Sequence, residues 1–343
     1  MNVTTVSELN ILSASLGVPF SASIELTTMC NFRCEHCYIP SHSQELSYSQ
    51  VIRFLDELKE MGVFEITLTG GEVALHSEFM RIVRYIRKKG FRLVIYTNLS
   101  LLTRRMMKEL SELHVKKIST TLFSLDDDIN SSITKHNNSG HLIMNRIVMV
   151  KEYGIPLEIK VPLMKKNYSG YMEILEYGRR MGCEVRYGSC ITKRTNGDEF
   201  PYTLALEQEE LNLFVLKYDK EFKNNKHLKV HKDDDWLCDA VKTGLHIGVD
   251  GNVYPCISFP YSYGNAKFQK LSDIWYNSER RHKLLEIRYN ALHECTSCEY
   301  IYFCNRCPGL AYSEQNTLTG CSKLNKMLAV AKAEVANMRE EGM

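Results

Sequence analysis

Apolar and polar positions follow two alternating periods through the first 190 residues of the chain. Short apolar runs, typical of buried strands, are each followed by a segment in which apolar residues recur three and four positions apart, as on one face of a helix. The runs predict six strands, at residues 23–27, 65–69, 92–96, 117–123, 157–161 and, beginning a sixth, 184–187. The helical spacing between them predicts five helices, at residues 51–61, 79–86, 106–113, 142–153 and 174–181.

Strict alternation of strand and helix predicts a parallel sheet, because neighbouring parallel strands need a long crossover connection. Since such crossovers are right-handed, the sheet curls in one direction. We therefore expect an α/β fold built as a partial (β/α)6 barrel, with its chemistry at the carboxyl ends of the strands. An open, doubly wound sheet is the alternative that periodicity alone leaves open.

The pattern changes after Asp198, where strand and helix stop alternating. Residues 206–223 predict a long helix, and residues 220–232 predict a polar, lysine-rich connector. These changes divide the chain into an N-terminal extension (1–22), the barrel (23–200), a helical connector (201–237), a cysteine-rich lobe that we expect to bind auxiliary clusters (238–322) and a C-terminal helix (323–343).

The cysteine-rich lobe begins with a hairpin and is followed by a helix. Two apolar runs, 245–249 and 253–256, flank Asp250-Gly251, which is a strong signal for a type I′ turn. Apolar residues at helical spacing then predict an amphipathic helix over residues 323–338.

Composition narrows the class of protein. The 343 residues are 44% hydrophobic and 24% charged, and the formal net charge of +2 gives no strong field that would attract a nucleic acid or a membrane surface. The first 18 residues lack the basic and apolar regions of a secretory signal, and no apolar run approaches the length of a membrane span. Twelve cysteines in such a chain indicate metal or redox chemistry in a reducing compartment, so we expect a cytoplasmic location.

Three of the cysteines stand together after the first predicted strand. Cys30, Cys34 and Cys37 have the spacing C-x3-C-x2-C, and thiolates are the ligands of iron–sulfur clusters. No fourth cysteine lies nearby in the sequence, so one iron of a 4Fe–4S cluster would keep a position for a small molecule, as a catalytic zinc does. A zinc loop is the simpler interpretation, but zinc sites usually pair C-x2-C with a second such pair or with histidines.

The triplet resembles the signature of the radical S-adenosylmethionine (SAM) superfamily. In that family the three cysteines hold a 4Fe–4S cluster whose open iron binds the amino and carboxylate groups of SAM. One electron then cleaves SAM to a 5′-deoxyadenosyl radical, which abstracts hydrogen from the substrate. The resemblance implies an enzyme with a partial barrel, and SAM as its cofactor.

Motifs at the next predicted strand ends are similar to the SAM site of the same family. Gly70, Gly71 and Glu72 resemble the GGEP motif that binds the SAM amino group, with Val73 in place of proline. Taken alone, this segment is an ordinary strand-to-helix turn, and its place after the second strand of a barrel favours the ligand site. Asn98 lies in a segment similar to the T-N-G run of the family, with leucine after it where glycine is common.

Other positions at the same rim are further candidates. Thr121 falls where relatives often carry a serine that contacts SAM, although threonine is also a common strand residue. His36 and Tyr38, on either side of the last triplet cysteine, are expected to border the adenine. Lys160 could reach a carboxylate, but a solvated lysine is the simpler interpretation. Cys190, near the end of the sixth strand, is a candidate catalytic residue.

Seven more cysteines lie between Cys238 and Cys321. Their order, C, G-x4-C, C-x2-C-x5-C-x2-C and C, is similar to the SPASM extension of radical SAM enzymes, with x2 in place of x3 at one step. A zinc ribbon is the alternative that spacing leaves open. The resemblance implies two auxiliary 4Fe–4S clusters, and therefore three clusters in all. The implied ligands are Cys295, Cys298, Cys304 and Cys321 for an outer cluster, and Cys238, Cys256 and Cys307 for an inner one.

The inner cluster would then have three thiolate ligands. Either it has an open iron, or Asp239, Cys190 or another group completes it.

The resemblance covers about residues 23–321, and SPASM enzymes mostly modify peptides. It implies a maturase of a ribosomally synthesised peptide, for which we expect thioether crosslinking; carbon–carbon or carbon–oxygen crosslinking and sulfatase-maturase-type oxidation are the alternatives. Expected partners are the precursor peptide and an electron donor such as flavodoxin or ferredoxin. The segment before the triplet is too short for a leader-binding winged-helix domain, so either a separate protein or the barrel itself would bind the leader.

A hypothesis from another class is a non-catalytic iron–sulfur protein that transfers electrons. Such a protein needs no SAM pocket, so Gly70, Gly71 and Glu72 weigh against it.

Overall fold

Nine strands form one sheet in the part of the chain that the computed structural model describes, residues 5–188, 190–218, 232 and 234–340. Their order across the sheet is β6-β5-β4-β3-β2-β1-β7-β8-β9. Strands β1 to β7 pair in parallel, whereas β8 and β9 are added antiparallel. The strands are β1 (Ser21–Thr27), β2 (Glu65–Gly70), β3 (Arg92–Tyr96), β4 (Lys117–Thr121), β5 (Leu157–Pro162), β6 (Glu184–Gly188), β7 (Gly244–Ile247), β8 (Asn252–Tyr254) and β9 (Gly264–Asn265).

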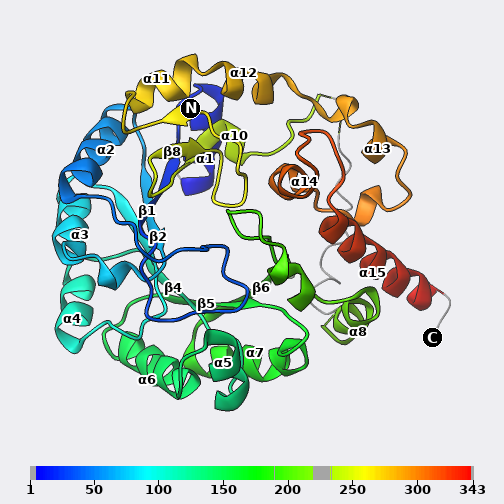
Figure 1. The fold of residues 1–343 in the computed structure, drawn as a ribbon, viewed down its shortest axis with the longest axis horizontal. Helices are drawn as coiled ribbons and strands as arrows, with labels where there is room; N and C mark the ends of the chain where they lie inside the picture. The colour runs from blue at the N-terminus through cyan, green and yellow to red at the C-terminus, as the bar shows by residue number, and fades with distance from the viewer. Residues whose placement is uncertain (1–4, 189, 219–231, 233, 341–343) are drawn as a thin grey trace.

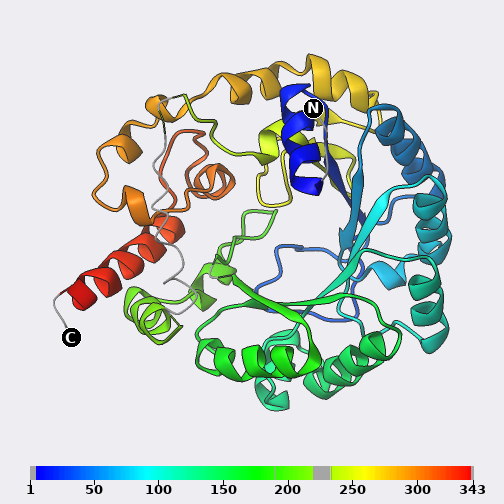
Figure 2. The same ribbon diagram turned by 180° about the vertical axis from the view of Figure 1, so that it is seen from behind.

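Strands β1 to β6 follow one another in chain order without the reversal that a doubly wound sheet requires. Figures 1 and 2 show the sheet curving inside a ring of helices, so the partial barrel is confirmed. The helices that lie outside these strands are α2 (Tyr48–Glu60), α3 (Phe79–Lys88), α4 (Arg104–Glu112), α6 (Ser139–Glu152) and α7 (Tyr171–Met181).

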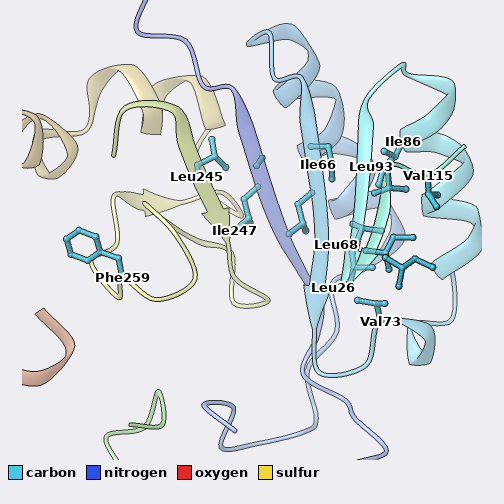
Figure 3. Packing of buried hydrophobic residues seen from close by; sticks show 14 of the residues in the cluster. Leu26, Ile66, Leu68, Val73, Ile86, Leu93, Val115, Leu245, Ile247 and Phe259 are labelled. Carbon is cyan, nitrogen blue, oxygen red and sulfur yellow. The ribbon is translucent and has the colours of Figure 1, made fainter. Parts of the chain in front are cut away.

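Buried apolar side chains fill the layer between the strands and the outer helices. Leu26, Ile66 and Leu93 come from three adjacent strands and are fully buried, as is Ile86 of α3, which lies beside Leu93 (Figure 3). Because successive side chains of a strand point to opposite faces, the intervening residues of these strands point into the barrel. Many of these inward residues are polar, and they form the walls of the cavities described below.

Before residue 200, two α-helices occur where the periodicity predicted none. Helix α1 (Val6–Ser15) has no apolar stripe, since Ser13 is its only buried residue, and it begins at a capping box in which Thr5 and Glu8 bond each other's backbone. Helix α5 (Asp127–Thr134) is short. Neither helix has the repeated apolar spacing by which a longer helix is recognised.

The predicted hairpin forms, but its turn is different. The Gly248 N–H donates to the Asn252 carbonyl (2.9 Å), so the loop has three residues, and Gly251 at φ 87° closes it. This is a type I turn followed by a left-handed glycine and not a two-residue type I′ turn. Its first strand, β7, pairs in parallel with β1, so the hairpin extends the barrel sheet.

The C-terminal third consists mostly of short helices. Helix α8 (Gln208–Tyr218) begins within the predicted long helix, and residues 219–231 and 233, which hold nearly all of the predicted connector, lie outside the described residues. The other helices are α10 (Ala240–Thr243), α11 (Leu271–Asn277), α12 (Glu279–Glu286), α13 (His293–Thr296), α14 (Pro308–Gln315) and α15 (Lys323–Glu340). None of the described helices has both the length and the apolar character that crossing a membrane requires.

Candidate functional site

The loop that carries the cysteine triplet follows β1 and is fixed against α5. The N–H groups of Arg33 and Glu35 donate to the carbonyls of Thr134 (2.9 Å) and Ile133 (3.0 Å) at the end of that helix. The Glu35 carboxylate also bonds Lys166 Nζ (2.8 Å) and pairs with a lysine at the α5 C-cap. Partial burial raises the pKa of Glu35, but these lysines outweigh it and hold that pKa below its usual value. Backbone hydrogen bonds and ion pairs thus fix the shape of the loop.

The three thiols are largely buried. Burial raises the pKa of Cys30 to about 11 and raises the pKa values of Cys34 and Cys37, and the charges of neighbouring thiolates contribute in the same direction for Cys30 and Cys34. The free thiols are therefore protonated at neutral pH. Binding of iron would release these protons, as metal binding to cysteine generally does.

The glycine pair packs against the backbone just before the triplet. A Cβ atom on Gly70 would lie 2.3 Å from the Thr27 carbonyl oxygen, and one on Gly71 would lie 2.2 Å from the Met29 carbonyl oxygen. The Gly71 N–H donates to Thr27 O (2.7 Å), and the Glu72 N–H donates to Met29 O (2.8 Å). Only glycine fits at both positions, because they bring the ends of β1 and β2 together.

Glu72 lies behind the cavity wall. Its side chain is fully buried and accepts hydrogen bonds from the Ala74 N–H (3.0 Å), the Thr97 hydroxyl (2.6 Å) and the Asn98 N–H (2.7 Å). Burial raises the pKa of this carboxyl, and the three donors oppose that shift. The carboxylate thus ties the end of β2 to the end of β3, and its role as the partner of the SAM ammonium group stays a prediction.

The Asn98 side chain reaches the cluster loop. Its Nδ2 donates to Asn31 Oδ1 (3.0 Å) and approaches Cys30 Sγ (3.9 Å). The following residue, Leu99, has φ 66° and is fully buried. It therefore adopts the left-handed conformation for which glycine is favoured.

A cavity of about 370 Å³ lies among these groups. Its walls include all of the residues that the sequence nominated for the SAM site and the triplet, apart from Glu72. The predicted residues that line it are Cys30, Cys34, Cys37, Tyr38, Gly70, Gly71, Asn98, Thr121 and Cys190.

Two further residues of this cavity fit a bound nucleoside and a carboxylate. Burial lowers the pKa of His36 to about 4, and its buried Nδ1 has no hydrogen-bond partner among the described residues. Lys160 is partly buried: its Nζ lies 3.3 Å from the centre of the Tyr96 ring, and burial lowers its pKa to about 8. The cavity thus offers a neutral imidazole and a partly desolvated cation to a ligand.

The later cysteines lie in two clusters with the membership that the resemblance implied, and their role as cluster ligands stays a prediction. Cys295, Cys298, Cys304 and Cys321 line one small cavity, and burial and the other three thiols raise the pKa of Cys304 to about 11. Burial, followed by the charges of Cys238 and Cys307, raises the pKa of Cys256 to about 12. Across the described residues, no three His, Cys, Asp or Glu side chains converge as ligands of one metal ion.

Asp239, one of the two residues named as fourth ligands of the inner group, follows Cys238, whose pKa is raised by burial and by the charges of Cys307 and Asp239. The Asp239 carboxylate is 83% exposed and pairs with Lys242 (3.1 Å). Cys190 lines the cavity of about 370 Å³ that holds the triplet.

A larger cavity, of about 830 Å³, adjoins the first and was not predicted. The two cavities share Tyr38, Ile39, Thr192, Ile257 and Ser258, and the last two of these directly follow Cys256. Glu25 and His246, from the inner faces of β1 and β7, also line it. Polar residues at the inward positions of β1 were the available signal in the sequence.

Comparison with family models assigns both halves of the chain. The radical SAM superfamily model matches residues 24–204, and the SPASM model, described as an iron–sulfur cluster-binding domain, matches residues 238–308.

The names of similar proteins indicate different activities. An AdoMet-dependent heme synthase of Methanosarcina barkeri is 24% identical over 88% of this chain and 94% of its own length. The antilisterial bacteriocin subtilosin biosynthesis protein AlbA of Bacillus subtilis is also 24% identical, over 86% of this chain and 68% of its own. Streptococcus suis SuiB, solved with its precursor peptide SuiA, has a TM-score of 0.71 at 14% identity and covers 93% of this chain and 80% of its own, a likeness that shows the fold alone.

Proposed function

This chain belongs to the radical SAM superfamily and carries a SPASM domain, and from that premise we propose that it modifies a ribosomally synthesised peptide. The observation that carries the proposal is the pair of adjoining cavities. The smaller holds the triplet thiols and the larger opens beside it under the SPASM hairpin. A peptide side chain in the larger cavity would therefore lie next to the SAM site. The subtilosin protein, by its name, supports a peptide substrate.

We assign the residues of the smaller cavity as follows. Cys30, Cys34 and Cys37 would hold the SAM-binding 4Fe–4S cluster, which with SAM supplies one-electron abstraction of hydrogen from a substrate carbon. Lys160 would bind the SAM carboxylate, and Glu72 would keep the Thr97–Asn98 turn in place.

The rest of the cavity would position SAM. Gly70, Gly71, Asn98, Thr121, His36 and Tyr38 complete its walls. Burial of the triplet keeps water from the reacting atoms.

For the bond formed we propose a thioether on a cysteine of the peptide. The inner auxiliary group has three thiols, and the residues after one of them, Cys256, line both cavities. A substrate thiolate bound there would lie near the carbon from which hydrogen is removed. A carbon–carbon or carbon–oxygen crosslink, with the auxiliary clusters only relaying electrons, is the rival.

The heme synthase relative favours a second candidate, modification of a tetrapyrrole. That protein is matched over nearly its whole length, whereas AlbA is matched over about two thirds of its length. An electron donor of the flavodoxin or ferredoxin type and a separate leader-binding protein remain part of the peptide proposal.

Anaerobic reconstitution tests the function. With SAM and dithionite, we expect release of 5′-deoxyadenosine and, with the precursor peptide, a product that has lost two hydrogens and one alkylatable thiol. A product that loses two hydrogens but keeps every thiol would contradict the thioether. Absence of deoxyadenosine from a protein with full iron content would contradict SAM cleavage itself.

A further inference from the structure

The larger cavity contains a buried carboxylate. Glu25 is 7% exposed, lies on the inner face of β1 and lines this cavity. Its Oε1 accepts from the Tyr38 hydroxyl (2.9 Å), and its Oε2 accepts from the Val249 N–H (3.2 Å). An ionised carboxylate has about four acceptor sites, so a ligand in the cavity can still donate to it.

No cation from the described part of the protein forms an ion pair with Glu25. Buried charges are costly unless they are paired. By comparison, the barrel carboxylate Glu158 is paired with Lys117 (3.1 Å) and Arg186 (3.1 Å). Burial raises the pKa of Glu25, as expected for a buried carboxyl without a counterion, so a cation from outside the chain would stabilise its ionised form.

The side chains around Glu25 do not supply a positive charge to pair with it. Burial lowers the pKa of His246 to about 4, so its imidazole is neutral at neutral pH. Burial raises the pKa of Tyr254 to about 12, so its phenol is neutral as well. Asp250, at the hairpin turn, adds a second negative charge to the cavity. The neighbourhood of Glu25 is therefore negative.

Two cations line other parts of the same cavity. Arg194 is paired with Asp198 and bonds the Glu35 carbonyl (3.4 Å), so its charge is largely compensated. Lys193 also lines the cavity. Lys193 and Arg194 can donate hydrogen bonds to the backbone carbonyls of a peptide, whereas Glu25 can bind a cationic group.

We propose that the larger cavity is a substrate subsite for a peptide residue that carries a protonated amine or a guanidinium, and that Glu25 binds this group. This inference rests on the proposed function and narrows its substrate class. A substrate rich in carboxylates, such as a tetrapyrrole with propionate groups, would face Glu25 and Asp250 and be repelled. The subsite thus favours a peptide over a tetrapyrrole.

Calorimetric titration of the reconstituted, SAM-bound protein under anaerobic conditions tests the subsite. The probes are three capped tripeptides that differ only at the central residue: Ac-Ala-Arg-Ala-amide, its citrulline analogue and Ac-Ala-Glu-Ala-amide. Citrulline keeps the shape of arginine and removes its charge. We expect the arginine peptide to bind about tenfold or more tightly than the citrulline peptide, at about 1.4 kcal/mol per decade, and the glutamate peptide to bind most weakly.

Variants assign the preference to Glu25. Glu25→Gln should bring the arginine-to-citrulline ratio close to one, whereas the matched control Glu109→Gln, on the outer helix α4, should keep the wild-type ratio. Circular dichroism checks that each variant folds. If Glu25→Gln does not fold, Glu25→Asp keeps the charge and shortens its reach, and should lower the ratio in part.

The outcomes separate the subsite from the function. A wild-type protein that releases deoxyadenosine but binds the arginine and citrulline peptides equally would overturn the subsite alone. So would a folded Glu25→Gln or Glu25→Asp variant that keeps the full ratio. A protein that prefers the arginine peptide but releases no deoxyadenosine would keep the subsite and overturn the proposed function.

Discussion

The barrel and the C-terminal lobe hold their cysteines by different means. In the barrel, the triplet loop follows a strand in which five of seven residues are buried, and backbone hydrogen bonds fix it to α5. In the lobe, no residue from 293 to 307 is buried, although three cysteines of the outer group lie there. The barrel packs its site onto a hydrophobic core. Residues 293–307 lack such a core, so binding of the cluster would hold this part of the lobe folded.

Replacing Cys30, Cys34 and Cys37 with alanine should give the largest effect. Because the barrel core does not depend on these thiols, the variant should fold and keep iron and sulfide for the lobe. Deoxyadenosine release should fall to background. Cys183→Ala, at a half-buried cysteine outside all three groups, is the matched control. Deoxyadenosine release by the triple variant would refute the assignment of the triplet.

Removing iron should unfold part of the C-terminal lobe and leave the barrel folded. We expect protease to cut residues 293–307 of the iron-free protein about tenfold or more faster than in the reconstituted protein, since local unfolding governs such cleavage. Fragments identified by mass spectrometry should leave the segment from β1 to β6 intact. Equal cleavage of the two forms in that range would show that the lobe folds without its clusters.

Replacing Glu72 should weaken SAM binding by an intermediate amount. Removing a hydrogen bond to a buried charge costs about 1.5–3 kcal/mol, so Glu72→Gln should weaken SAM binding by about one to two decades with iron content unchanged. Thr97→Val separates two explanations of this effect. If Glu72 acts by holding the turn, Thr97→Val also weakens SAM binding; if its carboxylate binds the SAM ammonium group directly, Thr97→Val leaves the dissociation constant nearly unchanged.

Loss of the Lys160 charge should weaken SAM binding least among these changes, and this effect should depend on pH. The pKa of Lys160 is lowered to about 8 by burial, aided by Lys117 and Arg186 and opposed by Glu158. The ammonium group is therefore present below about pH 8 and lost above it. If it binds the SAM carboxylate, the SAM dissociation constant should be flat below pH 8 and rise about tenfold per pH unit above it.

Lys160→Arg provides the control for this titration. The guanidinium stays charged across this range, so the variant should remove the rise above pH 8. A rise that persists in Lys160→Arg would assign the titration to another group.

The strands and the close spacing of the triplet were predictable because their signals are local, whereas the grouping of the later cysteines came from the family resemblance. Period and spacing appear in a single stretch of sequence, as for the triplet or for residues 65–69. The setting of Glu72 was not predictable, because its partners Thr97 and Asn98 come from another strand. The cavity around Glu25 was missed for the same reason, since Val249 and His246 lie more than 220 residues along the chain.

The pairing of β7 with β1 affects how the chain folds while it is being synthesised. Strand β1 has β2 on one side and β7 on the other, so one of its edges is completed only by residues 244–247. On the ribosome, the strand that leads into the triplet has an unpaired edge until these residues emerge. An open strand edge can pair with another chain. A fragment that ends after β6 would keep this edge permanently, so we expect it to aggregate when it is expressed alone.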